Sequence, residues 1–111
     1  MGPLTKGTVV LVPFPFSDLS NTKLRPAVAL AHVGRQDWIL CQVTSNPYGD
    51  ATAVKLTDSS FEQGSLRMIS YARAGKLFTA NQQLFKRTVG TLTSETTGSI
   101  VTSIINLLTR N

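Results

Sequence analysis

The 111-residue chain carries eleven Lys and Arg residues against six Asp and Glu, which leaves a formal net charge of +5 and a sequence pI near 9.9. This length allows one domain, and a hydrophobic content of 41% argues against disorder. The cations are dispersed along the sequence, so only folding can bring them together into a patch that binds a polyanion such as nucleic acid. One cysteine excludes an internal disulfide, and the absence of a signal-peptide pattern or a membrane-length apolar run predicts a cytoplasmic protein.

The first part of the chain predicts a strand, a loop and a hairpin. Residues 7–13 alternate with period two, and the strand should leave the sheet at Pro13, which cannot donate to the ladder. Residues 17–23 are polar and predict an exposed loop. Two apolar runs, 25–33 and 38–44, are separated by a short turn and predict an antiparallel hairpin. Arg25 precedes a proline, so it is extended and stands where the loop enters the second strand.

The remainder predicts short strands and one helix. The strands are expected at residues 53–56, 65–70, 76–79 and 86–92, with a polar connection over 58–64 and a bulge or bend at Gly75. Thr93 or Ser94 is the expected N-cap of a helix that docks on the sheet by one apolar face, formed by Ile100, Val101, Ile104, Ile105 and Leu108. The predicted fold class is mainly β, a small, strongly curved antiparallel barrel with a C-terminal helix, in a single domain over residues 1–111.

Several kinds of catalytic site do not fit these residues. The lone His32 and Cys41 cannot build a common zinc site, and carboxylates do not cluster for calcium or magnesium, so we expect no metal and no cofactor. Cys41 lies in an apolar run and is interpreted as core filler, and His32, in a central strand, as structural. Glycines of a nucleophile elbow or a phosphate-binding loop are also missing.

Arg25 and Thr44 are the candidates for a site at one rim of the sheet. In an antiparallel hairpin the start of one strand lies beside the end of its partner, so these two residues should meet. A guanidinium beside a hydroxyl suits a phosphodiester, because arginine can bind two phosphate oxygens and stabilise the charge of the transition state. RNA would then be cut by its own 2′-hydroxyl without a metal. That route needs a proton acceptor, for which arginine is poorly suited, and the residues leave it unnamed.

At these residues the chain resembles the MazF/PemK family of toxin ribonucleases, and most of all its PemK-like branch. The motifs that carry the resemblance are residues 7–12, the loop 13–23, Arg25-Pro26-Ala27-Val28, Gln42-Val43-Thr44-Ser45, and residues 70–79 followed by a helix. The resemblance implies an SH3-like barrel and a homodimer that is the toxin of a type II toxin-antitoxin system. It also implies a metal-independent, sequence-specific mRNA interferase that cleaves single-stranded RNA to a 2′,3′-cyclic phosphate. The expected partner is a cognate antitoxin that blocks the RNA groove and provides the only link to DNA.

The same resemblance implies roles for individual residues. The family's motif arginine falls on Arg25, as general acid or phosphate stabiliser, and its active-site threonine on Thr44, as hydrogen-bonding partner. Some relatives carry an Arg-x-Asp motif where this chain has Arg73-Ala74-Gly75, so that aspartate is missing. Asp18, Ser45 and Arg73 are candidates for catalysis or substrate positioning. The expected RNA contacts are Phe14, Phe16, Lys23, Gln42 and Lys76.

Three alternatives stay open at this point. Arg73 is either a phosphate contact or a surface charge, and Phe14 and Phe16 either stack on bases or belong to the core or a dimer interface. The missing acidic residue at Gly75 allows a non-catalytic SH3-like module that binds nucleic acid or the antitoxin. A relative that targets gyrase is disfavoured, because such proteins tend to depart from the Arg25 motif.

Overall fold

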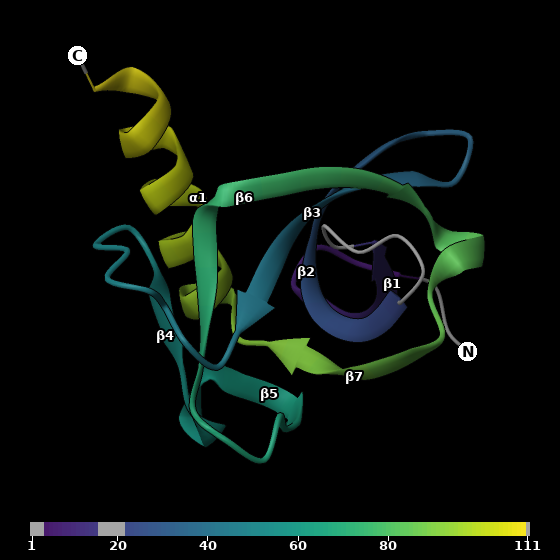
Figure 1. Ribbon diagram of the computed structural model, residues 1–111, viewed down its shortest axis with the longest axis horizontal. Coiled ribbons are helices and arrows are strands. Elements are labelled where there is room, and N and C mark those ends of the chain that lie inside the picture. Colours follow the sequence, from purple (N-terminus) through teal and green to yellow (C-terminus); the bar gives the residue numbers. More distant parts are fainter. Residues whose placement is uncertain (1–3, 16–21, 111) are drawn as a thin grey trace.

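The computed structural model describes residues 4–15 and 22–110, and this part of the chain folds into seven strands, two short 3₁₀ turns and one helix (Figure 1). All strand pairs are antiparallel, in the order β4-β6-β3-β2-β1-β7-β5, and the sheet curls into a nearly closed barrel. The predicted fold class is therefore confirmed. The elements are β1 (Thr8–Pro15), β2 (Thr22–Gly34), β3 (Asp37–Thr44), β4 (Val54–Leu56), η1 (Asp58–Ser60), β5 (Phe61–Gly64), β6 (Ser70–Asn81), η2 (Gln82–Leu84), β7 (Arg87–Leu92) and α1 (Ser94–Thr109).

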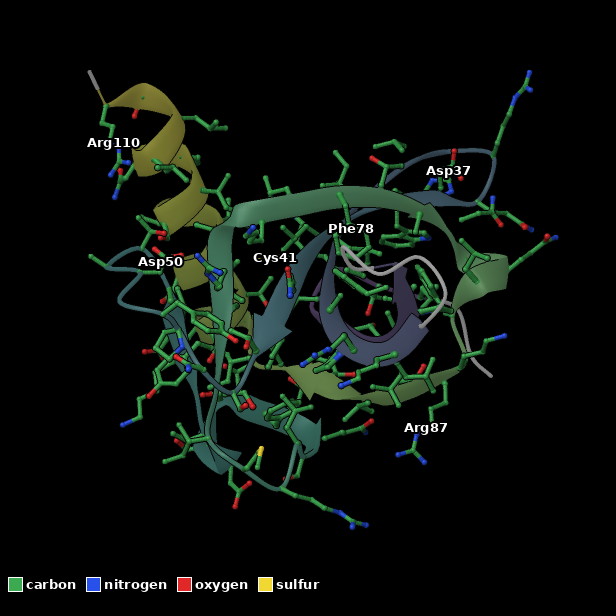
Figure 2. The ribbon with its side chains drawn as sticks, viewed as in Figure 1. Asp37, Cys41, Asp50, Phe78, Arg87 and Arg110 are labelled. Carbon is green, nitrogen blue, oxygen red and sulfur yellow. The ribbon has the colours of Figure 1, made fainter. Side chains whose placement is uncertain are left out.

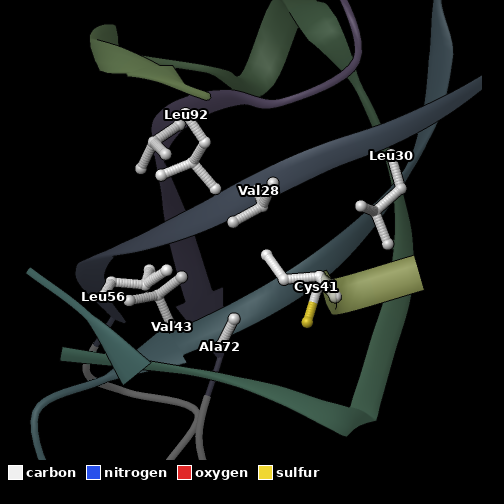
Figure 3. Packing of buried hydrophobic residues seen from close by; sticks show 9 residues of the cluster. Val28, Leu30, Cys41, Val43, Leu56, Ala72 and Leu92 are labelled. Atoms are coloured by element: carbon white, nitrogen blue, oxygen red, sulfur yellow. The ribbon is translucent and has the colours of Figure 1, made fainter. Parts of the chain in front are cut away.

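The central strands are buried on both faces, which explains why their sequences are continuously apolar. Ala27 and Ala29 belong to one hydrophobic cluster, toward which Phe78 points from β6 (Figure 2). Val28 and Leu30 belong to a second cluster, which includes Ile100 of α1 (Figure 3). Each large side chain buried in this way contributes roughly 1.5–3 kcal/mol. The hairpin β2–β3 is therefore a rigid support for groups at its ends.

The first two strands are longer than predicted. β1 continues through Pro13 to Pro15, and β2 begins at Thr22. β7 pairs with β1 only as far as Leu11, so the last part of β1 is a sheet edge, where proline is tolerated. Arg25 consequently lies inside β2, opposite Val12, and not at the start of the strand.

The segment between β4 and α1 also differs from the prediction. Residues 61–64 form β5 by pairing with β7, residues 65–69 are not a strand, and residues 70–81 form one continuous strand. Between β3 and β6, Cys41 pairs with Leu77 and Val43 with Ala72, so residues 73–76 bulge out opposite Gln42. The irregularity predicted at Gly75 is thus confirmed, and β6 turns sharply in this region (Figure 1).

The helix begins where the sequence predicts. The Thr93 hydroxyl oxygen accepts a hydrogen bond from the amide of Thr96 at 3.1 Å. Ile100 is fully buried and Val101 and Ile104 pack against its cluster, as predicted. Ile105 and Leu108 are 52% and 73% exposed, so the predicted docking is wrong for these two residues. The reason is length, because α1 extends past the sheet that covers its first turns (Figure 1). Within the described residues, no helix is long and apolar enough to cross a membrane.

Candidate functional site

Arg25 and Thr44 meet at one end of the β2–β3 hairpin. The β2–β3 ladder ends with the pair of Ala27 and Gln42, and Arg25 and Thr44 lie two residues beyond that pair on their strands. Both residues line one cavity of about 460 Å³, which we call the cationic cavity. The structure therefore brings both residues to one cavity, whereas their direct contact and their catalytic roles stay predictions.

Thr44 is held in a defined position at the end of β3. Its side chain is buried, and its Oγ1 accepts a hydrogen bond from the backbone amide of Asn46 at 3.2 Å. The Asn46 side chain in turn accepts a hydrogen bond from the amide of Tyr48 at 2.8 Å, a turn that ends the strand. Because the Thr44 oxygen is the acceptor in this contact, its hydroxyl proton is available to another acceptor.

Among the described residues, the charged side chains that line the cationic cavity are all positive. Its lining includes four cations, and none of the described residues that line it is Asp or Glu. Such a cleft attracts a polyanion, because the low-dielectric wall leaves the charges poorly screened. The cations are Lys23, Arg25, Arg67 and Arg87, and the hydroxyl-bearing residues are Thr44, Ser45, Ser65 and Ser70.

Arg67 and Arg87 were missed by the sequence reasoning. Arg87 reaches the cavity because β7 pairs with β1, which sets Arg87 opposite Leu11, and Leu11 opposite Pro26 of β2. Arg67 reaches it from the loop between β5 and β6. Both placements depend on strand pairs that are distant in sequence, and local periodicity carries no signal for them. The only hint is the excess of cations over the chain as a whole.

Three of the predicted RNA contacts line a second cavity of about 440 Å³, which we call the aromatic cavity. Phe14, Gln42 and Lys76 meet there with Phe78 and other apolar residues of β6. The rings of Phe14 and Phe78 pack edge to face, with their centroids 4.6 Å apart. Phe14 is half-buried, so it both supports the core and forms part of the cavity wall.

The two cavities adjoin along β1 and β2. Val12 pairs with Arg25, Pro13 with Leu24 and Phe14 with Lys23. In each pair the β1 residue lines the aromatic cavity and the β2 residue lines the cationic one. A molecule that crosses this strand pair can therefore contact both cavities.

Arg73 lies in another environment. Its Nε donates a hydrogen bond to Oδ2 of Asp50 at 3.0 Å, and its guanidinium lies over the ring of Tyr48. A hydrogen bond from the Thr52 hydroxyl, and then the contact with Arg73, hold the pKa of the Asp50 carboxyl below its usual range. Arg73 is not among the residues that line either cavity. It is thus a largely buried, ion-paired residue, and its role as a phosphate contact stays a prediction.

The remaining residues that the sequence singled out are not among the described residues that line either cavity. Asp18 and Phe16 lie outside the described residues. Cys41 is core filler as predicted, because it is fully buried, its thiol donates to the carbonyl of Arg73, and burial raises its pKa to about 12. His32 is exposed and packs edge-on against Trp38. Within the described ranges, no three His, Cys, Asp or Glu side chains lie close enough together to hold a metal ion.

Comparison with known proteins identifies a family. Residues 5–108 match the model of the PemK-like, MazF-like toxin of type II toxin-antitoxin systems. Solved structures of the same fold include MazF from Deinococcus radiodurans (TM-score 0.75, 16% identity, 99% of this chain and 100% of that chain) and the Mycobacterium tuberculosis toxin MazF-mt6 (0.72, 16%, 94% and 98%). A third is a mycobacterial endoribonuclease in complex with its cognate antitoxin (0.72, 16%, 97% and 95%). Curated proteins give no significant match.

Proposed function

Since the chain belongs to the PemK-like, MazF-like toxins of type II toxin-antitoxin systems, we propose that it is an endoribonuclease that cleaves single-stranded mRNA at the cationic cavity. The observation that carries this proposal is the meeting of Arg25 and Thr44 in a cavity whose charged lining, within the described residues, is entirely cationic. A phosphodiester is the ligand that such a lining favours, because guanidinium groups and hydroxyls both donate hydrogen bonds to phosphate oxygens.

The proposed reaction uses the substrate's own nucleophile. The 2′-oxygen forms a bond to the neighbouring phosphorus while the bond from phosphorus to the 5′-oxygen breaks, which yields a 2′,3′-cyclic phosphate and a 5′-hydroxyl. Arg25 stabilises the negative charge that develops on the non-bridging oxygens or protonates the leaving oxygen. Thr44 donates its hydroxyl proton to a phosphate oxygen, since its own oxygen already accepts from the amide of Asn46.

The acceptor of the 2′-hydroxyl proton has no candidate among the described cavity residues, which include neither a carboxylate nor a histidine. Asp18 is the proposed acceptor, since it precedes the Arg25 motif by seven positions in the sequence. The same observation favours a second candidate function. In that alternative the chain is a non-catalytic module that binds RNA or an antitoxin through the same surface.

Incubation with a long single-stranded RNA in EDTA, with the cuts mapped by sequencing, distinguishes the endoribonuclease from the non-catalytic module. The wild type should give discrete cuts with cyclic phosphate ends. Arg25→Ala should lose about 10²–10³-fold in rate, the amount that one oxyanion donor supplies. Thr44→Val should lose activity and Thr44→Ser should retain it, because only serine keeps the donor. Undiminished cutting by Arg25→Ala contradicts the assignment, and tight RNA binding without cuts by the wild type supports the non-catalytic module.

The proposed partners follow from the family. A mycobacterial endoribonuclease and a Deinococcus MazF of this fold were solved in complex with an antitoxin. We therefore propose that this chain binds a cognate antitoxin and that it contacts DNA only through that antitoxin. We also propose that the chain is a homodimer, that it is cytoplasmic and that it does not bind membranes. Co-expression with the adjacent open reading frame, followed by light scattering, tests the antitoxin and the dimer in one experiment.

A further inference from the structure

We propose that the loop between β5 and β6, together with Arg87, forms a nucleotide subsite beside the cleavage site. In this subsite Arg67 and Arg87 bind a phosphate that flanks the scissile one, and the apolar wall that includes Met68 contacts the attached base. The inference rests on the proposed function.

The strand register supports the position of the flanking phosphate. Pro26, Leu11 and Arg87 form one row across β2, β1 and β7. Neighbouring strands lie about 4.8 Å apart, so this row spans about 10 Å from the residue after Arg25 to Arg87. Arg87 is exposed and extends from β7 away from the barrel (Figure 2). Arg25, one residue before this row, alternates to the other face of β2, but Arg25 and Arg87 both line the cationic cavity, so an RNA whose scissile phosphate lies on Arg25 can present a neighbouring phosphate to Arg87.

The loop that carries Arg67 is held at both ends by side chains. Ser65 Oγ donates to Oδ1 of Asp58 at 2.9 Å and accepts from the amide of Arg67 at 3.0 Å. Ser70 Oγ donates to the carbonyl of Met68 at 3.2 Å. Arg67 has a φ of 68°, a left-handed conformation that arginine rarely adopts. These contacts fix the loop so that Arg67 and Met68 form part of the cavity wall.

The chemistry of this wall favours a nucleotide. Met68 is 63% exposed although it is apolar, and Leu66 and Val89 line the cavity beside it. A flexible thioether adapts to a flat apolar surface such as the face of a base. The hydroxyl protons of Ser65 and Ser70 are donated to Asp58 and to the carbonyl of Met68, so these two oxygens can only accept hydrogen bonds, for example from the amino group of a base. Cations for the phosphate and an apolar contact for the base thus occur side by side.

The test measures binding and cleavage separately. Binding uses a single-stranded RNA made non-cleavable by a 2′-deoxy nucleotide at the mapped cut, titrated over a range of salt concentrations. The variants are Arg67→Gln and Arg87→Gln, and the matched control is Arg35→Gln, an exposed arginine at the opposite end of the β2–β3 hairpin. Each subsite variant should reduce the magnitude of the slope of log K against log salt by up to about 0.7, the value for one phosphate contact in a single strand. Their KM for cleavage should rise while kcat is retained.

Met68→Ser should leave the salt slope unchanged and reduce the base preference at one position beside the cut by about tenfold, the loss expected when an apolar contact is removed from a specificity pocket. Slopes, KM values and base preferences equal to those of Arg35→Gln would overturn the subsite. A wild type that binds this RNA but never cleaves the unmodified form would overturn the proposed function, while the binding data would still decide the subsite.

Discussion

Arg73 of β6 is joined to Asp50, in the loop that follows Thr44, by an ion pair with 3.0 Å between Nε and Oδ2. The same carboxylate accepts hydrogen bonds from the amide and hydroxyl of Thr52, whose carbonyl accepts from the hydroxyl of Ser103 in α1 at 2.6 Å. The loop after Thr44 is therefore attached to both β6 and α1. Arg73 thus has its acidic partner in the loop after β3 and not two residues further along β6, where this chain has Gly75.

Two variants decide whether Arg73 positions the loop or contacts RNA. Arg73→Ala and Asp50→Asn both break the ion pair, and each should lower the free energy of unfolding by about 1–2 kcal/mol, since the pair is mostly but not fully buried. Equal losses of kcat in the two variants, measured well below their melting temperatures, indicate positioning. A fall in RNA affinity in Arg73→Ala alone indicates that the guanidinium contacts phosphate.

The Asp50 interactions should also appear in the pH dependence of stability. The pKa of this carboxyl is lower in the folded chain than in the unfolded one, so its contribution is present above the unfolded value near 3.9 and is lost as the pH falls through the lowered folded value. The difference in unfolding free energy between wild type and Asp50→Asn should be constant from pH 5 to 7 and shrink below about pH 4. Urea titrations at each pH measure it, and a difference that grows on acidification contradicts the assignment.

Cys41 should be inert in the folded protein. Burial, and secondarily the negative charge of Asp50, raise the pKa of its thiol to about 12, so the reactive thiolate does not form near neutral pH. We expect a thiol reagent at pH 8 to label Cys41 only after unfolding. Above a pH of about 8.5 the unfolded chain loses the thiol proton and the folded chain does not, so stability should fall as the pH rises toward 12. Cys41→Ala should remove that decline.

The two halves of α1 should respond differently to mutation. Ile100→Ala leaves a cavity in the cluster of Figure 3 and should cost about 2–5 kcal/mol. Leu108→Ala alters a side chain that is mostly exposed and should change the free energy of unfolding by less than about 0.5 kcal/mol. Chemical denaturation of both variants measures the contrast. A cost for Leu108→Ala near that of Ile100→Ala would instead show that this end of the helix is covered in solution.

Local information was enough to predict one half of the site. The meeting of Arg25 and Thr44 follows from a short turn between two apolar runs of similar length, and a hairpin register is a local property. The bulge near Gly75 and the Thr93 cap were also readable, because each depends on a residue's own conformational preference. The continuation of β1 from Pro13 to Pro15 could not be predicted, since a proline is tolerated at a sheet edge and the sequence does not show which stretch of a strand is an edge.

Arg67 and Arg87 illustrate what could not be predicted. Their place in the cavity depends on the pairing of β7 with β1 and of β5 with β7, and both pairs join segments that are far apart in the chain. β5 is short and mostly polar, so its sequence resembles that of a loop between two strands. Gly64 and Gly90 approach each other closely in that pair, and a Cβ on Gly64 would lie 2.3 Å from the carbonyl oxygen of Val89. This steric need for glycine is visible only once the partner strand is known.

The pairing of β1 with β2 has a consequence for how such a site can change. Side chains alternate between the faces of a sheet, so a shift of β2 by one residue would exchange Arg25 for its neighbour Leu24 or Pro26 and turn the guanidinium away from Thr44. Substitutions within either cavity can alter substrate preference gradually. An insertion or deletion within the paired strands would separate the phosphate-binding arginine from its hydroxyl partner in a single step, although every residue of the site would still be present.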